Sequence, residues 1–300
     1  MKTIRLSEYI RQRSSSIHKS SSYKSKLRNT ASKIEDFEHF LGRELYTQDF
    51  DDRMMEEFDY FLRNNPKNLR RSTIGSLGAN VAFALKKAKD DKYSVDIRYS
   101  EYVFPSSETC SVALTTEEIK RIFELKKLSE EQNNARFWFL FGCCTGLRFS
   151  DLKRVETINF TAENYIYIRT KKTNTCVLIP THWMIKDLMK DFPELPKMKT
   201  QQSFNKIIKR LCRKAKINDK ILIERHEGTK FVRKQFPKWQ LITSHTVRRS
   251  FATNAYLSGI PVARIMLFTG HKTEESFFRY IKINKKENAK TLSNHKFFNR

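Results

Sequence analysis

Six residues in the C-terminal two-thirds of the chain have side chains that together could act on a phosphodiester. They are two arginines, a lysine, two histidines and a tyrosine: Arg148, Lys172, His245, Arg248, His271 and Tyr280. Guanidinium groups match phosphate oxygens bidentately, and fixed cations stabilise the negative charge of a transition state. A phenol beside such cations can act as a nucleophile. The set therefore predicts attack of a tyrosine on a phosphodiester.

The six residues lie in short motifs whose combination and order are more specific than any one of them. Arg148 ends a Thr-Gly-Leu-Arg motif. His245 and Arg248 share a His-x-x-Arg pattern, and His271 ends a Thr-Gly-His motif. The tyrosine follows nine positions later. Each motif alone is common by chance, whereas the ordered set is not, so we treat the six as one predicted active site.

The N-terminal third has the periodicity of packed helices. Apolar residues recur at spacings of three and four in three stretches between residues 23 and 92. These are Ile34, Phe37, Phe40 and Leu41, then Met54, Met55, Phe58, Phe61 and Leu62, and then Ile74, Leu77, Val81, Leu85 and Ala88. One apolar face on each helix predicts a small helical bundle.

The rest of the chain is expected to be mainly helical with two strand-rich segments. A helix is expected to begin at Thr115 or Thr116, and the apolar run at residues 137–144 predicts a buried helix. Residues 165–179 predict a hairpin whose turn carries two lysines, and residues 221–242 form a second strand-rich segment. The expected fold class is therefore mainly α with a small β component (α+β).

The net charge of +25 points to a polyanionic partner. Residues 1–105 carry 20 Lys/Arg and 15 Asp/Glu, a net of +5. The remaining 38 and 18 (58 − 20 and 33 − 15) give a net of +20. The excess thus lies in the part of the chain that carries the predicted site, as expected for binding to nucleic acid.

Cysteine usage and hydropathy predict a cytoplasmic protein without membrane contact. The five cysteines are odd in number and include no Cys-x-x-Cys pair, so buried, reduced thiols are expected. No apolar stretch approaches the ~18 residues of a membrane span, and the N-terminus lacks the apolar core of a secretory signal.

With these motifs in this order, the sequence resembles the tyrosine recombinase (phage integrase) family, in particular the branch carried on bacterial conjugative transposons and invertible DNA segments. The resemblance covers nearly the whole chain. It implies a basic leader at residues 1–22, a helical core DNA-binding domain at 23–105, a linker at 106–113 and a catalytic domain at 114–300. It further implies a site-specific DNA recombinase that acts through a 3′-phosphotyrosine intermediate without a metal or other cofactor.

The resemblance gives each residue of the predicted site a role. Arg148 and Arg248 are expected to clamp the scissile phosphate, and Tyr280 is expected to attack it. His245 and His271 are expected to hydrogen-bond the nonbridging oxygens and to help move the tyrosine proton.

The lysine has two candidates, Lys171 and Lys172. Adjacent residues near a hairpin turn face opposite sides, so only one of the two is expected to reach the phosphate. The family pattern favours Lys172 as general acid to the departing 5′ oxygen. Lys171 is then expected to contact DNA or to remain a solvated charge.

Further residues are predicted to support the site or to contact DNA. Asp151 follows Arg148 by three positions and is expected to orient it, with a purely structural salt bridge as the alternative. Arg249 would point about 100° away from Arg248 on a helix, which predicts a DNA-backbone contact or a solvated charge. Basic residues of the second strand-rich segment are further predicted DNA contacts: Lys230, Arg233 and Lys234.

Three other interpretations compete with this assignment. A metal site is disfavoured because neither His245 nor His271 has a cysteine or carboxylate at ligand spacing. A type IB topoisomerase would use the same residues on a single duplex. A non-catalytic regulator would use residues 246–265 as a helix-turn-helix with His245 as a helix cap, which explains neither Arg148 nor Tyr280.

The resemblance also implies partners. These are double-stranded DNA, three further copies of the chain in a synaptic homotetramer, and accessory DNA-bending proteins. Bound to DNA, the protein is expected to associate with the bacterial nucleoid. Two adjacent aromatic residues near the C-terminus, Phe297 and Phe298, are predicted to dock on a neighbouring catalytic domain.

Overall fold

The computed structural model describes residues 2–18, 20–104, 111–192, 194–271, 273–281 and 293. The chain forms two compact units, which are described separately. The first comprises residues 1–110 and 223–234, and the second comprises residues 111–222 and 235–300. The first unit is therefore discontinuous in sequence.

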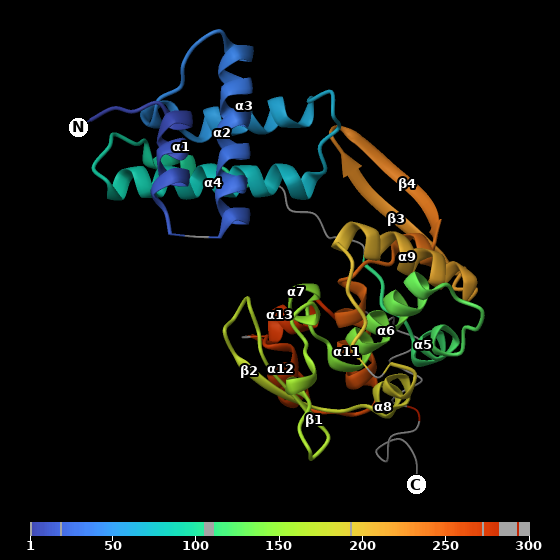
Figure 1. Ribbon diagram of the computed structural model, residues 1–300. Coiled ribbons are helices and arrows are strands. Elements are labelled where there is room, and N and C mark those ends of the chain that lie inside the picture. The colour runs from blue at the N-terminus through green and yellow to red at the C-terminus, as the bar shows by residue number, and fades with distance from the viewer. Residues whose placement is uncertain are drawn as a thin grey trace. The chain divides into compact units, whose positions relative to one another are not determined.

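The first unit is a helical bundle (Figure 1). Its helices are α1 (Leu6–Ser16), α2 (Ser21–Leu41), α3 (Asp52–Arg63) and α4 (Arg71–Asp90), with 3-10 turns at Thr47–Asp49 and Ile97–Ser100. The three periodic stretches form α2, α3 and α4, as predicted, and their apolar faces share one core, except that Phe40 is 62% exposed. Side-chain caps begin two of the helices, because Ser20 accepts from the Tyr23 N–H and Asp51 from the Met54 N–H.

The segment predicted as a basic leader, residues 1–22, contributes to this core. Leu6, Tyr9 and Ile10 lie along one face of α1 and are buried. Most other positions of α1 are serine or arginine, so the composition of the segment does not indicate a buried helix. The spacing of these three apolar residues is nevertheless helical. The first helix is therefore part of the bundle.

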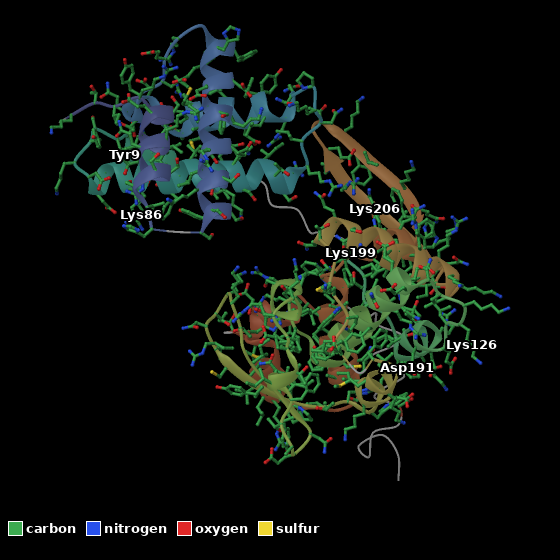
Figure 2. All side chains as sticks on the ribbon, in the orientation of Figure 1. Tyr9, Lys86, Lys126, Asp191, Lys199 and Lys206 are labelled. Carbon is green, nitrogen blue, oxygen red and sulfur yellow. The ribbon has the colours of Figure 1, made fainter. Side chains whose placement is uncertain are left out.

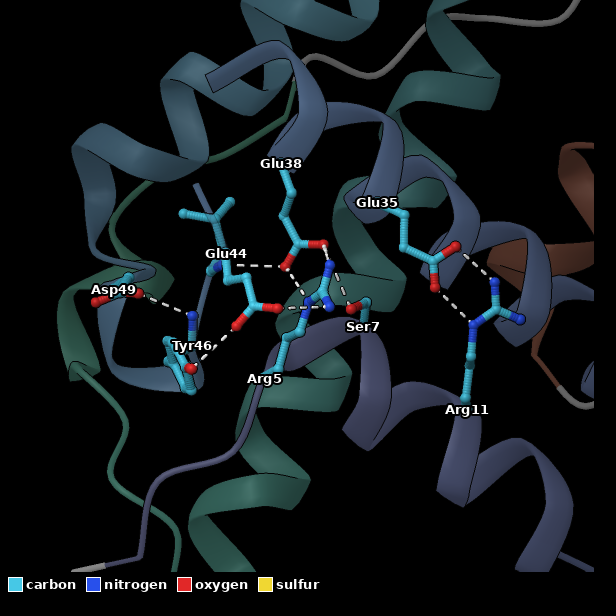
Figure 3. A network of polar contacts seen from close by, with 9 residues as sticks. Arg5, Ser7, Arg11, Glu35, Glu38, Glu44, Tyr46 and Asp49 are labelled. Atoms are coloured by element: carbon cyan, nitrogen blue, oxygen red, sulfur yellow. Dashed lines mark hydrogen bonds and ion pairs between the residues drawn. The ribbon is translucent and has the colours of Figure 1, made fainter. Parts of the chain in front are cut away.

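Polar contacts tie α1 and the residue before it to α2 (Figure 3). Arg5 donates from Nε and Nη2 to the two carboxylate oxygens of Glu38, at 3.0 and 2.8 Å. Glu38 is buried, and it also accepts the Leu45 N–H at 3.0 Å. Arg11 and Glu35 form a second, exposed pair. A buried carboxylate is tolerated here because its oxygens are hydrogen-bonded.

The second unit is mainly helical, with a small sheet. Its helices are α5 (Thr116–Phe123), α6 (Glu130–Thr145), α7 (Phe149–Leu152), α8 (Trp183–Lys190), α9 (Gln201–Lys214), α10 (Lys238–Leu241), α11 (Thr246–Leu257), α12 (Val262–Thr269) and α13 (Glu274–Phe278), with a 3-10 turn at Thr157–Asn159. Strands β1 (Tyr165–Arg169) and β2 (Cys176–Pro180) pair antiparallel, with Tyr165 opposite Pro180. This is the predicted hairpin.

Strands β3 (Lys220–Glu227) and β4 (Lys230–Pro237) form a separate two-stranded sheet in the second predicted strand-rich segment. The turn between them belongs to the first unit, where the Gly228 N–H donates to the carbonyl of Leu69 at 2.8 Å. The prediction of a mainly helical fold with a small β component is confirmed.

Helix α6 is the centre of the second unit. Residues 137–144 are buried all round, and the helix packs against α5, α8, α9 and α11. A helix that is apolar on every side needs such neighbours on every side. Thr115 provides the cap of α5, with its hydroxyl accepting the Glu118 N–H at 3.2 Å.

The surface of the second unit carries many of the basic residues. Lys126, Lys199 and Lys206 are exposed on it (Figure 2). Within the described ranges, no helix is long and apolar enough to cross a membrane.

The cysteine prediction holds for three residues and fails for one. Cys143, Cys144 and Cys212 are buried free thiols. Cys176 is exposed, because side chains alternate along β2 and this position faces outward. Cys110 lies outside the described residues.

Candidate active site

Arg148 is positioned by the break between α6 and α7. Helix α6 ends at Gly146, whose φ of 68° is left-handed. A Cβ at this position would lie 2.5 Å from a ring atom of Phe251, so both the backbone and the space require glycine. Arg148 then turns into extended backbone and precedes α7. Its Nη1 is buried and has no hydrogen-bond partner in the described part of the chain.

Arg248 lies in the first turn of α11 and is 1% exposed. Its Nη1 donates to the carbonyl of Gly146 at 2.8 Å, and its Nη2 donates to the carbonyl of Thr269. These carbonyls lie at the ends of α6 and α12, where the helix dipole favours a cation. Among the described residues, its Nε has no partner. Burial, and then Arg148, lower the pKa of Arg248 to about 10, so it remains a cation at neutral pH.

Tyr280 and His245 are in direct contact. The Tyr280 hydroxyl lies 2.8 Å from Nε2 of His245. Tyr280 is two residues beyond α13, which is anchored by the fully buried Phe277. Burial lowers the pKa of His245 to about 4, with the cations of Arg249 and Arg248 as the next causes. His245 is therefore neutral at pH 7 and able to accept a proton.

The ring of His271 also packs against the ring of Tyr280. It follows Gly270, which ends α12 with a φ of 61°. Its Nδ1 lies 2.8 Å from the Thr269 hydroxyl, and its ring centroid is 4.6 Å from that of Tyr280. Burial, and then Arg248, lower the pKa of His271 to about 4. Its Nε2 is buried without a partner in the ranges that the structure describes.

The turn between β1 and β2 carries both candidate lysines, and both are exposed. The carboxylate of Asp151 accepts the Lys171 N–H at 2.8 Å, which fixes the turn to α7. The charge of Lys172 is among the causes that lower the pKa of His245. The structure therefore brings five of the six residues together within the second unit: Arg148, His245, Arg248, His271 and Tyr280. Lys172 is exposed in a turn of the same unit, and its part in the site stays a prediction.

Asp151 does not contact Arg148 in the way that its spacing suggests. Its partners are the Lys171 N–H and the exposed Arg154, whose Nη1 lies 3.9 Å away. Positions three apart share a helix face only when both are inside the helix, and Arg148 precedes α7. The carboxylate instead anchors the turn that carries the lysines.

Arg249 is half-buried and lies beside the nucleophile. Its guanidinium carbon is 5.9 Å from the ring centroid of Tyr280, and that of Arg248 is 5.8 Å from it. Burial lowers the pKa of Arg249. The angle between neighbours on a helix describes only the Cα–Cβ direction, whereas a long arginine side chain can curve back toward the site. Of the two predicted alternatives, the solvated charge does not fit this position.

The other predicted DNA contacts belong to the first unit. Lys230, Arg233 and Lys234 belong to residues 223–234 of the first unit. Arg233 pairs across the hairpin with Glu224, with Nε 3.0 Å from the carboxylate. Their contact with DNA stays a prediction.

Two backbone groups of the site were not singled out in the sequence. The carbonyls of Gly146 and Thr269 hold Arg248, and both residues lie in the motifs that also supply Arg148 and His271. The recurrence of Thr-Gly shortly before Arg148 and before His271 is the available signal.

The helix-turn-helix alternative assigned His245 a capping role. Helices α11 and α12 are indeed joined by a short turn, but His245 makes no side-chain capping bond. Its ring contacts Tyr280 instead.

Comparisons with known proteins agree with this arrangement. The phage integrase family model matches residues 112–287, and the phage integrase SAM-like domain model matches residues 5–103. A comparison with curated proteins gives no match.

Several solved structures share the fold. A lambda integrase (75–356) dimer bound to a COC′ core site has a TM-score of 0.70 at 15% identity, covering 94% of this chain and 97% of that one. The Tn1549 transposon integrase with circular intermediate DNA has a TM-score of 0.70 at 14% identity, covering 97% and 100%. XerH recombinase bound to a palindromic difH substrate has a TM-score of 0.67 at 16% identity, covering 96% and 94%.

Proposed function

Because the chain belongs to the phage integrase family, we propose that it is a site-specific tyrosine recombinase that cleaves and rejoins double-stranded DNA. One observation carries the proposal. Beside the tyrosine, two buried guanidinium nitrogens lack a partner among the described residues: Arg148 Nη1 and Arg248 Nε. Buried polar atoms are normally hydrogen-bonded, so these are suited to a ligand with several acceptor oxygens. A phosphodiester is such a ligand.

In the proposed reaction, the Tyr280 oxygen attacks phosphorus and the bond from phosphorus to the 5′ oxygen breaks. The phenolic proton passes to His245, and Lys172 donates a proton to the departing 5′ oxygen. The products are a 3′-phosphotyrosine and a free 5′-hydroxyl. Attack by a 5′-hydroxyl reverses the step, so joining needs no ATP.

Arg148 and Arg248 stabilise the charge that develops on the nonbridging oxygens. This role is often filled by a metal ion, and two fixed guanidinium groups supply it here. We therefore expect cleavage to persist when EDTA is added. A strict requirement for a divalent metal in the chemical step would contradict this mechanism.

A suicide substrate tests the proposal. The protein incubated with a nicked duplex of its own site should form a covalent complex that resists SDS and is removed by protease. Tyr280→Phe should bind the duplex with near-normal affinity and form no complex. Tyr256→Phe is the matched control, because Tyr256 lies in α11 and its ring meets that of Phe278 edge to face, at an interplanar angle of 81°. An adduct in the Tyr280→Phe variant would identify another nucleophile.

The alternatives differ from this proposal in their products. A type IB topoisomerase relaxes supercoils on one duplex, whereas a recombinase exchanges strands between two sites. A non-catalytic regulator leaves the DNA uncut. An assay with two copies of the recombination site, scored by product size and by relaxation of supercoils, separates all three.

We propose that the active assembly on DNA is a tetramer linked through C-terminal segments. A cavity of about 380 Å³ on the second unit supports this. Its lining includes the aromatic rings of Trp183 and Phe251, and Ile260. The predicted occupant, a neighbouring copy's Phe297 and Phe298, lies outside the described residues. Accessory DNA-bending proteins and association with the nucleoid are further expectations.

A further inference from the structure

Two guanidinium groups, not one, lie near the ring of Tyr280. Arg248 is held by two backbone carbonyls, and it belongs to the phosphate clamp proposed above. Arg249 forms no ion pair with a carboxylate among the described residues, although it is half-buried. A half-buried cation without a counterion is costly unless something else stabilises it. The electron-rich face of an aromatic ring is one such partner.

The charges that face the Tyr280–His245 pair come from four places in the second unit. Helix α11 supplies Arg248 and Arg249, and the residue before α7 is Arg148. Lys172 lies in the hairpin turn, and His271 follows α12. Arg249 is the strongest of these cations in lowering the pKa of His245, after burial. Asp151 is the carboxylate that acts on Arg248.

We propose that Arg249 is a positioning residue for the nucleophile, which acts on the Tyr280 ring and on its hydrogen-bonded neighbour His245. As the phenol loses its proton, Arg249 stabilises the negative charge that spreads over the ring. It also keeps His245 neutral and so able to accept. One cation thus acts on both partners of the hydrogen bond. This inference rests on the proposed function, because it assigns Arg249 a part in the same reaction.

Single-turnover cleavage at saturating protein separates this role from DNA binding. Arg249→Gln should slow formation of the covalent complex roughly five- to thirtyfold, the range of a partly desolvated cation on an aromatic ring. The pH of half-maximal cleavage should rise. Arg249→Lys, which keeps the charge, should recover most of the rate. Arg279→Gln is the matched control, since Arg279 adjoins Tyr280 but is exposed and paired with Glu275.

A second measurement does not depend on recombinase activity. In the DNA-free protein, NMR titration of the His245 ring should give a higher pKa in Arg249→Gln than in the parent, and no change in Arg279→Gln. If the parent forms no covalent complex, the proposed function fails, and this titration still decides the inference. An unchanged His245 titration overturns it. The inference is also overturned if Arg249→Gln at saturating protein cleaves with the rate and pH profile of the parent. Arg249 would then be a DNA contact only.

Discussion

Arg148 and Arg248 carry the same charge in different surroundings, and this separates their effects on catalysis and stability. Arg248 fastens the ends of α6 and α12 through two carbonyls. Arg148 has a buried nitrogen without a partner in the described chain, and it lowers the pKa of Arg248 by repulsion. Arg248 thus stabilises the fold as well as the proposed site, whereas the buried nitrogen of Arg148 is suited to a ligand.

Replacing each arginine by methionine, which is of similar volume and uncharged, should slow cleavage by about 10²–10³ in both cases, as for loss of an oxyanion donor. Arg248→Met should also lower the free energy of unfolding by about 1–3 kcal/mol per carbonyl left unpaired. Arg148→Met should leave the melting temperature unchanged or raised, because it removes an uncompensated charge. Calorimetry of the DNA-free variants checks this, and an equal loss of stability in both would refute it.

The two histidines make stability depend on pH. The pKa of His245 and of His271 is lowered to about 4 in the folded protein, from an ordinary value of 6.5. Between these values the unfolded chain binds more protons, so the free energy of unfolding should fall as pH drops from 6.5 toward 4. Above pH 6.5 the two histidines should not make the free energy of unfolding depend on pH. Denaturant titrations of the parent and of His245→Gln check this, and an unchanged acid slope in the variant would contradict it.

At the residue scale, the sequence predicted which residues belong to the site better than it predicted which groups each of them contacts. Five of the six residues of the predicted site lie together, whereas the place of Lys172 stays a prediction. Arg249 and Asp151 were assigned from helical angles and spacing, which do not include side-chain length or the residues of other elements. Their neighbours, Tyr280 and the turn at Lys171, come from distant parts of the chain.

Among the elements, the β1–β2 hairpin carries both lysines that are candidates for the general acid. Asp151 fixes the backbone of the turn at Lys171, and the side chains of Lys171 and Lys172 are both exposed. A turn that is held at one peptide group places both candidate lysines in the same short segment. The choice between the two lysines therefore has a chemical test.

Lys172→Ala should slow cleavage of a normal substrate by about 10²–10⁴, the usual contribution of a general acid. A duplex with sulfur in place of the bridging 5′ oxygen should restore the rate, because a thiolate leaves without a proton. Lys171→Ala should cleave both substrates at near the parental rate. Rates of covalent complex formation on the two duplexes provide the measurement, and the opposite pattern would assign the acid to Lys171.

Helices with long apolar stripes were predictable because their periodicity is local. The first helix was missed as part of the core, since only Leu6, Tyr9 and Ile10 mark its buried face. The hairpin at residues 220–237 was predictable as strands, but nothing local indicates that its turn binds the loop before α4. Pairings between distant segments depend on the assembled fold.

At the scale of the whole molecule, the features that bear on assembly are the C-terminal tail and a cavity. The tail after Ile281 is polar and basic apart from a few apolar residues, and the cavity beside Trp183 is mainly apolar. Burial of two phenylalanines in such a cavity would link neighbouring protomers.

Deletion of residues 291–300 should spare binding of one protomer to a single site while lowering cooperative occupancy and strand exchange. Ile260→Arg, which adds charge to the cavity wall, should produce the same defect in a full-length chain. Gel-shift titrations on single and paired sites measure cooperativity. If the truncated protein binds and recombines as the parent does, the tail has no part in assembly.

The unpartnered buried nitrogens of the active site also have a consequence for the lifetime of the protein in the cell. A ligand that binds only the folded state stabilises it by about 2.7 kcal/mol at a hundredfold excess over its Kd. Target DNA, by supplying the missing acceptor oxygens, should therefore lower the population of open forms that proteases attack. Molecules without a site would be degraded faster than molecules on DNA. The abundance of this DNA-cutting enzyme would then follow the number of its targets, and a pulse-chase experiment in cells with and without those sites would measure the difference in half-life.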